Sequence, residues 1–214
     1  MTFRGWPVEA IEFFEGLGAD NSKAYWQTHR DVYEERVRAP MEALLAELQS
    51  EFGDGRMFRP YRDVRFSADK SPYKSHAGAR IGSNGYVQLG ADGLAGGYGM
   101  WEMSPDQLER YRAAVDDDGS GEDLVAIVGA VHDAGHEIMS RETLKTAPRG
   151  YPKDHPRIEI LRYKGIAVWH SWGVGAWLGT TKAKAKIEGF FRDSRPLGAW
   201  LEEHVGPAQV PDRR

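Results

Sequence analysis

The stretch AGARIGSNGYVQLGADGLAGGYGMW, residues 77–101, decides the fold. Its apolar side chains recur with a period of two, which is typical of strands. The tripeptides Ser-Asn-Gly at 83–85 and Ala-Asp-Gly at 91–93 interrupt this pattern and are typical of tight turns. The sequence therefore predicts an antiparallel β-meander, with strands near 57–66, 77–82, 85–90 and 94–103.

Helical patterns lie on both sides of the predicted meander. Apolar residues recur at three- and four-residue spacing, Ser22 is placed to cap a helix, and Ser104 to Gln107 has the spacing of a capping box. We expect a polar loop at 116–121 and a buried strand at 166–172. The expected helices are 7–17, 22–37, 40–52, 104–115, 124–131, 158–162, 187–191 and 197–201. A single α+β domain over 1–214 follows, its meander packed against N-terminal and C-terminal helices.

Composition excludes several kinds of chemistry. The 214 residues include no cysteine, which excludes disulfides, thiolate nucleophiles and iron–sulfur clusters and suits a cytoplasmic protein. Neither a secretory signal nor a membrane-spanning run is present. Gly97-Tyr-Gly99 lacks the third glycine of a dinucleotide fingerprint. His132 and His136 have the spacing of metal ligands, but Gly135 is expected to end their helix, so we predict no metal and no cofactor.

Positive charge is concentrated in two segments. Residues 56–80 carry a net charge of +5 and residues 141–164 carry +4, although the whole chain carries −4. The rest of the chain therefore carries −13. Such an asymmetry can focus a positive field on one surface.

The first basic motif is RDVRFSADKSPYK, residues 62–74. On a strand, Arg62 would share a face with Val64 and Phe66, where an arginine needs a carboxylate or a bound anion. Guanidinium and ammonium groups together suit a phosphate pocket, which makes candidates of Arg62, Arg65, Lys70 and Lys74. Alternatively, Asp63 and Asp69 form a structural ion-pair network with the two arginines, although two carboxylates cannot also neutralise the two lysines.

The second basic motif is LKTAPRGYPKDHP, residues 144–156. It is a proline-rich loop in which Lys145, Arg149 and His155 could converge on a ligand. A solvated connection is the alternative interpretation.

Both motifs resemble the signature of the family called domain of unknown function 2461. Asn21-Ser-Lys-Ala-Tyr-Trp26 is similar to the opening of that family, with Ser22 and Trp26 where members more often have Asn and Phe. The resemblance covers about residues 8–205. It implies one full-length domain of a bacterial protein, and it carries over no catalytic residue and no cofactor.

The sequence favours a protein that binds a small anionic, phosphate-bearing ligand. The predicted anion site consists of Arg62, Arg65, Lys70 and Lys74, closed by Lys145 and Arg149; hydrolase or transferase activity would use Asp63, Asp69 or His155 as acid or base. One alternative is a non-enzymatic interaction protein in which the motifs are structural ion-pair networks. The other is a nucleic-acid-binding protein, which the charge of −13 outside the segments 56–80 and 141–164 disfavours. No membrane partner is expected, and the sequence predicts no oligomeric state.

Overall fold

The computed structural model of the chain describes residues 2–65 and 67–209, and it confirms the α+β class. Six strands form a sheet in the order β1-β2-β3-β4-β6-β5. The chain divides into two compact units. Unit 1 consists of Met1–Gly96 and Ser171–Phe190, and unit 2 consists of Gly97–His170 and Phe191–Arg214.

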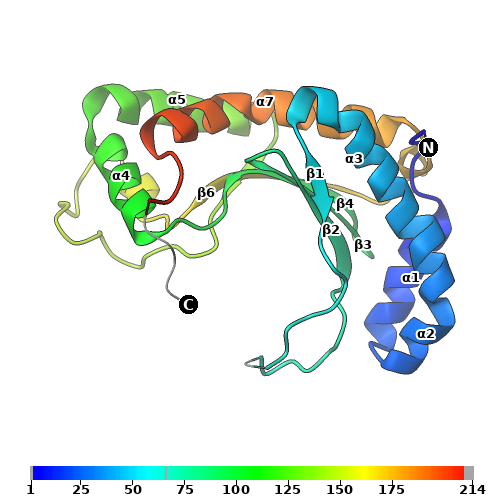
Figure 1. Cartoon of the computed structure of the whole chain (residues 1–214). Helices are drawn as coiled ribbons and strands as arrows, with labels where there is room; N and C mark the ends of the chain where they lie inside the picture. The colour runs from blue at the N-terminus through cyan, green and yellow to red at the C-terminus, as the bar shows by residue number, and fades with distance from the viewer. Residues whose placement is uncertain (1, 66, 210–214) are drawn as a thin grey trace. The chain divides into compact units, whose positions relative to one another are not determined.

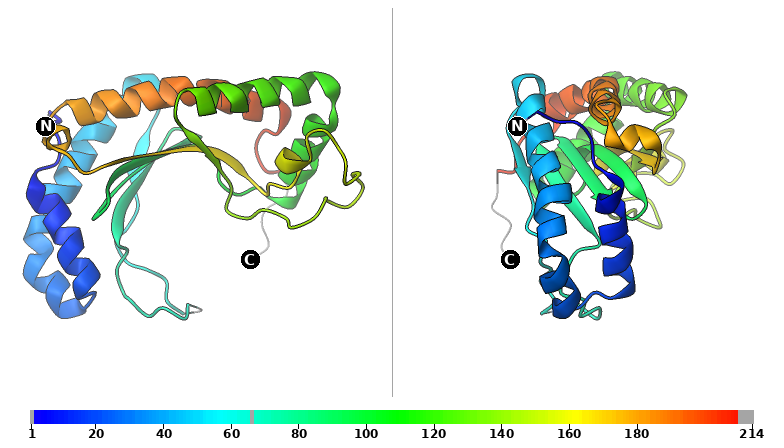
Figure 2. Two further views of the ribbon diagram at one scale, coloured as in Figure 1. Left: turned by 180° about the vertical axis from the view of Figure 1, so that it is seen from behind. Right: turned by 90° about the vertical axis from the view of Figure 1, so that its right-hand side faces the viewer.

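Unit 1 begins with helices that follow the predicted pattern. They are α1 (Val8–Ala19), α2 (Lys23–Val32), the π-helix η1 (Tyr33–Arg38) and α3 (Ala39–Phe52), and both views of Figure 2 show α1 beside the other three. The Ser22 side chain accepts a hydrogen bond from the Tyr25 amide at 3.1 Å, which confirms the predicted cap. Pro40 has no N–H to donate, and the chain widens into a π turn just before it rather than breaking.

The predicted meander is confirmed for three of its four strands. These are β2 (His76–Ile81), β3 (Gly85–Gly90) and β4 (Gly93–Met100), and β2 and β3 pair antiparallel with Ala79 opposite Val87. In unit 1, α3 contacts β1 and β2, and buried leucines of α3 contribute to the core together with Ile81, Val87 and Leu89.

The strand predicted near 57–66 is wrong. The strand β1 is Gly55–Met57, and residues 58–65 and 67–75 lie in a long loop between β1 and β2 (Figure 1). Prolines at 60 and 72 cannot donate ladder hydrogen bonds, and pairing in this loop is reduced to an isolated bridge between Tyr61 and Tyr73. Arg62 and Val64 therefore do not share a strand face, and Phe66 lies outside the described residues.

Unit 2 contains α4 (Pro105–Asp116), α5 (Asp118–Asp133), β5 (Glu137–Met139) and α6 (Ile158–Leu161). The capping box of α4 is confirmed, since the Ser104 amide donates to Gln107 Oε1 at 3.1 Å. The polar loop predicted at 116–121 is wrong. Asp117 ends α4 and also caps α5 through a hydrogen bond from the Ser120 amide, so one residue connects the helices.

The strand β6 (Ile166–Gly173) confirms the strand predicted at 166–172, and β5 pairs antiparallel with it. A 3₁₀ turn, η2 (Ala176–Gly179), precedes the last helix, α7 (Lys182–His204). The prediction of two separate helices, at 187–191 and 197–201, is wrong, because α7 continues through Pro196. No helix in residues 2–65 and 67–209 is long and apolar enough to cross a membrane.

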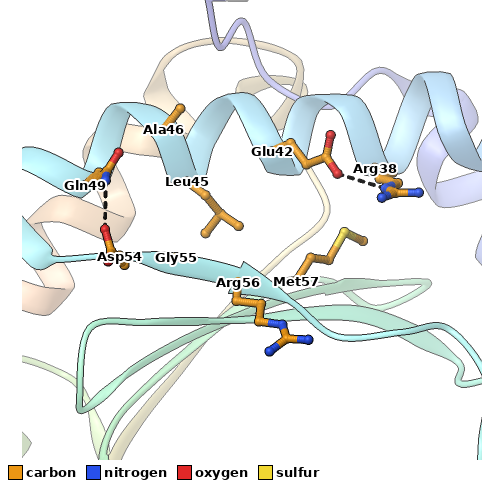
Figure 3. Close-up of a pocket in the computed structure, with 9 residues that line it drawn as sticks. All are labelled: Arg38, Glu42, Leu45, Ala46, Gln49, Asp54, Gly55, Arg56 and Met57. Carbon is orange, nitrogen blue, oxygen red and sulfur yellow. Dashed lines mark hydrogen bonds and ion pairs between the residues drawn. The ribbon is translucent and has the colours of Figure 1, made fainter.

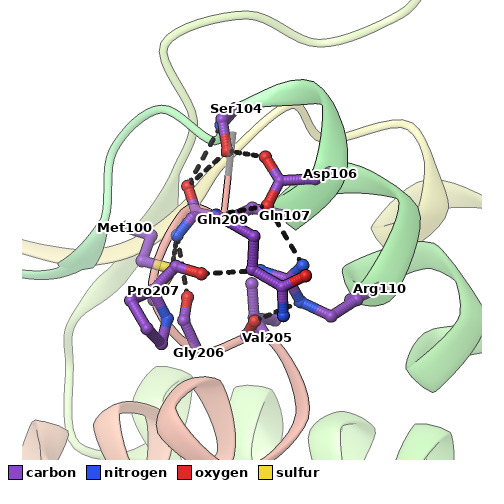
Figure 4. Close-up of polar contacts among 9 residues, drawn as sticks. All are labelled: Met100, Ser104, Asp106, Gln107, Arg110, Val205, Gly206, Pro207 and Gln209. Atoms are coloured by element: carbon purple, nitrogen blue, oxygen red, sulfur yellow. Dashed lines mark hydrogen bonds and ion pairs between the residues drawn. The ribbon is translucent and has the colours of Figure 1, made fainter. Parts of the chain in front are cut away.

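Residues 205–209 are held by the first turns of α4, within unit 2 (Figure 4). The Arg110 guanidinium donates to the carbonyls of Val205 and Pro207, at 2.5 and 2.8 Å. The Gln107 side chain donates to the carbonyl of Gly206 at 2.8 Å, and Asp106 accepts from the Gln209 amide at the same distance. These bonds fix the chain that leaves α7.

Candidate functional site

The first basic motif lies in unit 1, in the loop between β1 and β2. Two backbone hydrogen bonds close the base of this loop: the Arg62 amide donates to the Pro72 carbonyl at 2.9 Å, and the Lys74 amide donates to the Pro60 carbonyl at 2.8 Å. The ring of Tyr73 is buried against Trp26 of α2, with 4.3 Å between the ring centroids and 7° between the planes. The base of the loop is thus fixed on a helix.

Both arginines of this motif face carboxylates. Arg62 pairs with Asp69, and Arg65 donates to Asp63 through Nε at 2.9 Å and through its terminal nitrogen at 2.6 Å. The hydrogen bonds from Arg65 lower the pKa of Asp63 to about 2, and Arg62 and Ser71 lower the pKa of Asp69. The geometry matches the ion-pair alternative for these four residues.

The two lysines of the motif differ from the arginines. Lys70 Nζ donates to the Val64 carbonyl at 3.0 Å, and Lys74 Nζ lies 5.3 Å from the ring centroid of Phe58. Neither has a carboxylate within 4.0 Å among the residues that the structure describes. Burial, and after it the positive charge of Arg59, lowers the pKa of Lys74. Lys74 is therefore partly desolvated and lies within the field of one other cation, Arg59.

A cavity of about 370 Å³ lies beside the base of the loop, within unit 1. Four arginines and one glutamate contribute to its wall, together with aromatic rings. The lining residues are Trp26, Arg30, Tyr33, Glu34, Arg38, Arg56, Met57, Phe58, Arg59, Pro60 and Tyr61. They come from α2, η1, β1 and the residues directly after β1.

The charges of this wall are not balanced. Arg38 is paired with Glu34 at 3.0 Å and with Glu42 at 2.8 Å. In residues 2–65 and 67–209, no carboxylate oxygen lies within 4.0 Å of the side-chain nitrogens of Arg30, Arg56 or Arg59. Three guanidinium groups without carboxylates on one cavity wall attract an anion, and their flat fork geometry suits phosphate or carboxylate.

A second hollow, of about 620 Å³, continues from this cavity between α3 and β1 (Figure 3). It shares Arg38, Arg56 and Met57 with the cavity, and it adds the acidic side chains of Glu42 and Asp54. Asp54 accepts a hydrogen bond from Gln49 at 2.7 Å. Of the two, the cavity therefore has the larger excess of positive charge, and the adjoining hollow is mixed in charge.

The second basic motif lies in unit 2. Lys145 and Arg149 are exposed there, and neither has a carboxylate partner within the described chain. Their predicted part in closing the anion site stays a prediction. His155 of the same motif is buried, with both ring nitrogens engaged: Nδ1 accepts from the Arg157 amide at 3.0 Å, and Nε2 lies 3.1 Å from Asp116 Oδ1.

None of the predicted acid–base residues belongs to the described lining of the cavity. Asp63 and Asp69 hold arginines, and His155 is used inside unit 2. The structure also shows no group of three or more potential metal ligands among the residues it describes. The described lining therefore combines four arginines and aromatic rings with one carboxylate, that of Glu34.

Sequence reasoning missed the helix side of this cavity. Trp26, Arg30, Glu34 and Arg38 follow one another at intervals of four residues, which places them on one face of a helix. This four-residue spacing is the sequence signal that could have identified the helix side of the cavity. Arg56 and Arg59 belong to the basic segment 56–80, but nothing in the sequence distinguishes them from the arginines of that segment that pair with carboxylates.

A family model described as "Conserved hypothetical protein (DUF2461)" matches residues 9–200. No curated protein and no solved structure matches the chain.

Proposed function

The chain belongs to the DUF2461 family, and we propose that it binds a small anionic, phosphate-bearing ligand in the cavity of unit 1. One observation carries the proposal: Arg30, Arg56 and Arg59 line one cavity and have no carboxylate partner among the described residues. Three like charges held together repel one another, so an anion that binds between them relieves that repulsion.

The first motif contributes to this site through its lysines. Lys74 lies against Phe58, which lines the cavity, and Arg59 acts on its charge. We include Lys74 in the site, and Lys70 as a second positive charge of the same loop. Arg62 and Arg65 already hold Asp69 and Asp63, so we assign them to the shape of the loop.

The proposal is for binding and not for a defined reaction. A hydrolase or transferase would need an acid or base at the ligand. Glu34, the carboxylate of the lining, is paired with Arg38, and burial raises the pKa of the lining residue Tyr33 to about 12. A phenol with so high a pKa is poorly suited to proton transfer near neutral pH, and the Glu34 carboxylate is already engaged by Arg38.

Titration calorimetry with inorganic pyrophosphate tests the proposal. We expect saturable binding to the wild type that weakens as salt is added, because the attraction is largely electrostatic. Arg59→Ala should weaken binding about tenfold, as expected for a lost charge-assisted hydrogen bond. Arg36→Ala is the matched control, since Arg36 is exposed on η1 and does not line the cavity.

Two results contradict the proposal. One is that the folded wild type takes up no pyrophosphate at low salt. The other is that Arg59→Ala and Arg36→Ala bind it equally well. Arg59 is exposed, so its truncation leaves the core intact, and a circular dichroism melt of each variant verifies this.

A further inference from the structure

The cavity wall that carries the arginines also carries aromatic rings. Trp26, Tyr33, Phe58 and Tyr61 all line it. Trp26 and Tyr33 are buried, but Phe58 is 43% exposed and Tyr61 is 51% exposed. Two large exposed rings on a concave, positively charged surface are not required by the core, and such rings are common in ligand sites.

We propose that the ligand carries a flat aromatic or heteroaromatic ring joined to its anionic group, as nucleoside phosphates do. This inference rests on the proposed function, because the arginines hold the anion. It adds the class of ligand: the rings of Phe58 and Tyr61 stack on or pack against a ring, while Arg30, Arg56 and Arg59 take the phosphate.

The aromatic side of the site is held in place before any ligand binds. Tyr61 lies 5.4 Å from Tyr73 and 6.1 Å from Trp26, measured between ring centroids, and Trp26 stacks on Tyr73. Lys74 Nζ lies over the Phe58 ring and restricts it. Rings that are already ordered lose little conformational entropy on binding, which favours recognition of another ring.

The size and the charge of the surroundings favour a small ligand over a polymer. The cavity of about 370 Å³ is within the range of small-molecule sites, about 300–1,000 Å³. A nucleic acid strand would have to extend beyond it, and the adjoining hollow presents Glu42 and Asp54. These carboxylates oppose a continuous chain of phosphates.

Calorimetry with four probes separates the parts of the inference. The probes are adenosine 5′-monophosphate, uridine 5′-monophosphate, ribose 5-phosphate and adenosine. We expect at least one nucleotide to bind about tenfold tighter than ribose 5-phosphate, because base stacking adds to the phosphate contact. Adenosine without phosphate should bind more weakly than the nucleotides.

Variants assign the two contributions to residues. Phe58→Leu combined with Tyr61→Leu should remove the advantage of the nucleotides over ribose 5-phosphate. Arg59→Ala should weaken nucleotides and ribose 5-phosphate alike. Trp101→Leu is the matched control, since Trp101 is an exposed aromatic residue outside the cavity lining.

Each contrary outcome points to a different failure. Equal binding of nucleotides and ribose 5-phosphate, with both weakened by Arg59→Ala, overturns the ring and keeps the anion site. A short oligonucleotide that binds more than about tenfold tighter per strand than the nucleotides replaces the small ligand with a nucleic acid. Absence of binding by every phosphate probe overturns the inference together with the proposed function.

Discussion

Asn21 and Tyr73, 52 residues apart, hold each other through two hydrogen bonds. The Asn21 side-chain amide donates to the Tyr73 carbonyl at 3.0 Å, and the Tyr73 amide donates to Asn21 Oδ1 at 3.1 Å. Asn21 directly precedes the Ser22 cap of α2, and Tyr73 closes the loop that carries the first basic motif. Two of the three segments that resemble the family signature therefore meet in this pair.

Asn21→Asp should destabilise the protein by about 1–3 kcal/mol, because a carboxylate can accept from the Tyr73 amide but cannot donate to its carbonyl. Urea denaturation measures the loss. The amide of Lys74, which bonds to the Pro60 carbonyl, should also exchange hydrogen faster in the variant. Asn84→Asp introduces the same charge in the turn between β2 and β3 and should change stability by less than about 0.5 kcal/mol. Equal effects of the two substitutions would show that the pairing contributes nothing beyond charge.

Gly93 has a positive φ of 95°, and a Cβ added there would lie 2.0 Å from the Gly173 carbonyl oxygen, inside unit 1. Gly93→Ala combines backbone strain with a clash against backbone, and we expect a loss of about 3 kcal/mol or more. Gly129 is exposed inside α5, and a Cβ there meets nothing within 4 Å. Gly129→Ala should therefore stabilise by about 0.5–1 kcal/mol. Thermal melts of both variants measure this contrast, which fails if the two shifts have the same sign.

The sequence predicted the elements whose signals are local. Ser22 and Ser104 marked the starts of helices, and the tight turns of the meander marked its hairpins. The prediction from sequence failed where contacts with residues distant in the chain determine the local structure. Residues 58–75 have strand-like composition, but they pack against α2 through Tyr73 rather than along a strand. Two helices were predicted at 187–191 and 197–201, yet α7 continues through Pro196 and buries Phe191 and Leu197 on either side of it, and this packing outweighs the proline.

Only the positive charge of the candidate site could be predicted from the sequence. The excess of positive charge in 56–80 was visible in the sequence, and two of its arginines, Arg56 and Arg59, line the cavity. The pairing of Arg62 with Asp69 depends on the path of an irregular loop, which has no periodic pattern to reveal it. Arg30 joins Arg56 and Arg59 only because α2 and β1 fold against the same space.

Arg157 is a buried arginine of unit 2 that satisfies the end of α4. Its guanidinium donates to the Val115 carbonyl at 2.6 Å and to the Asp116 carbonyl at 2.7 Å. Arg157→Met keeps much of the apolar stem and leaves both carbonyls without a donor, so we expect a loss of about 2–4 kcal/mol in urea denaturation. Arg149→Met, at an exposed position of the second motif, should stay within about 0.5 kcal/mol of the wild type. If Arg157→Met is as stable as the wild type, water replaces the guanidinium at the end of α4.

Glu47 and Lys184 form an ion pair at 2.8 Å within unit 1. This pair should make the protein less stable as the pH falls. Hydrogen bonds from Lys184 and from the Phe3 amide lower the pKa of Glu47 in the folded protein. A carboxyl group with a lowered folded-state pKa stabilises the protein above its unfolded-state pKa of about 4.3, and this contribution is lost as the pH falls through the folded-state value.

Glu47→Gln keeps an acceptor for the Phe3 amide and removes the charge. The variant should therefore be less stable than the wild type by about 0.5–1 kcal/mol at pH 6–7, and the difference should shrink as the pH falls below about 4.3 and through the lowered folded-state pKa of Glu47. Urea denaturation of both proteins across this range measures the difference. Glu15→Gln removes an exposed carboxylate of α1 that has no cation within 4.0 Å in the described residues, and it serves as the control. A difference for Glu47→Gln that does not shrink as the pH falls to the acid limit of the folded state would mean that the carboxylate acts through its shape and not through its charge, because a charge effect must disappear once the group is protonated.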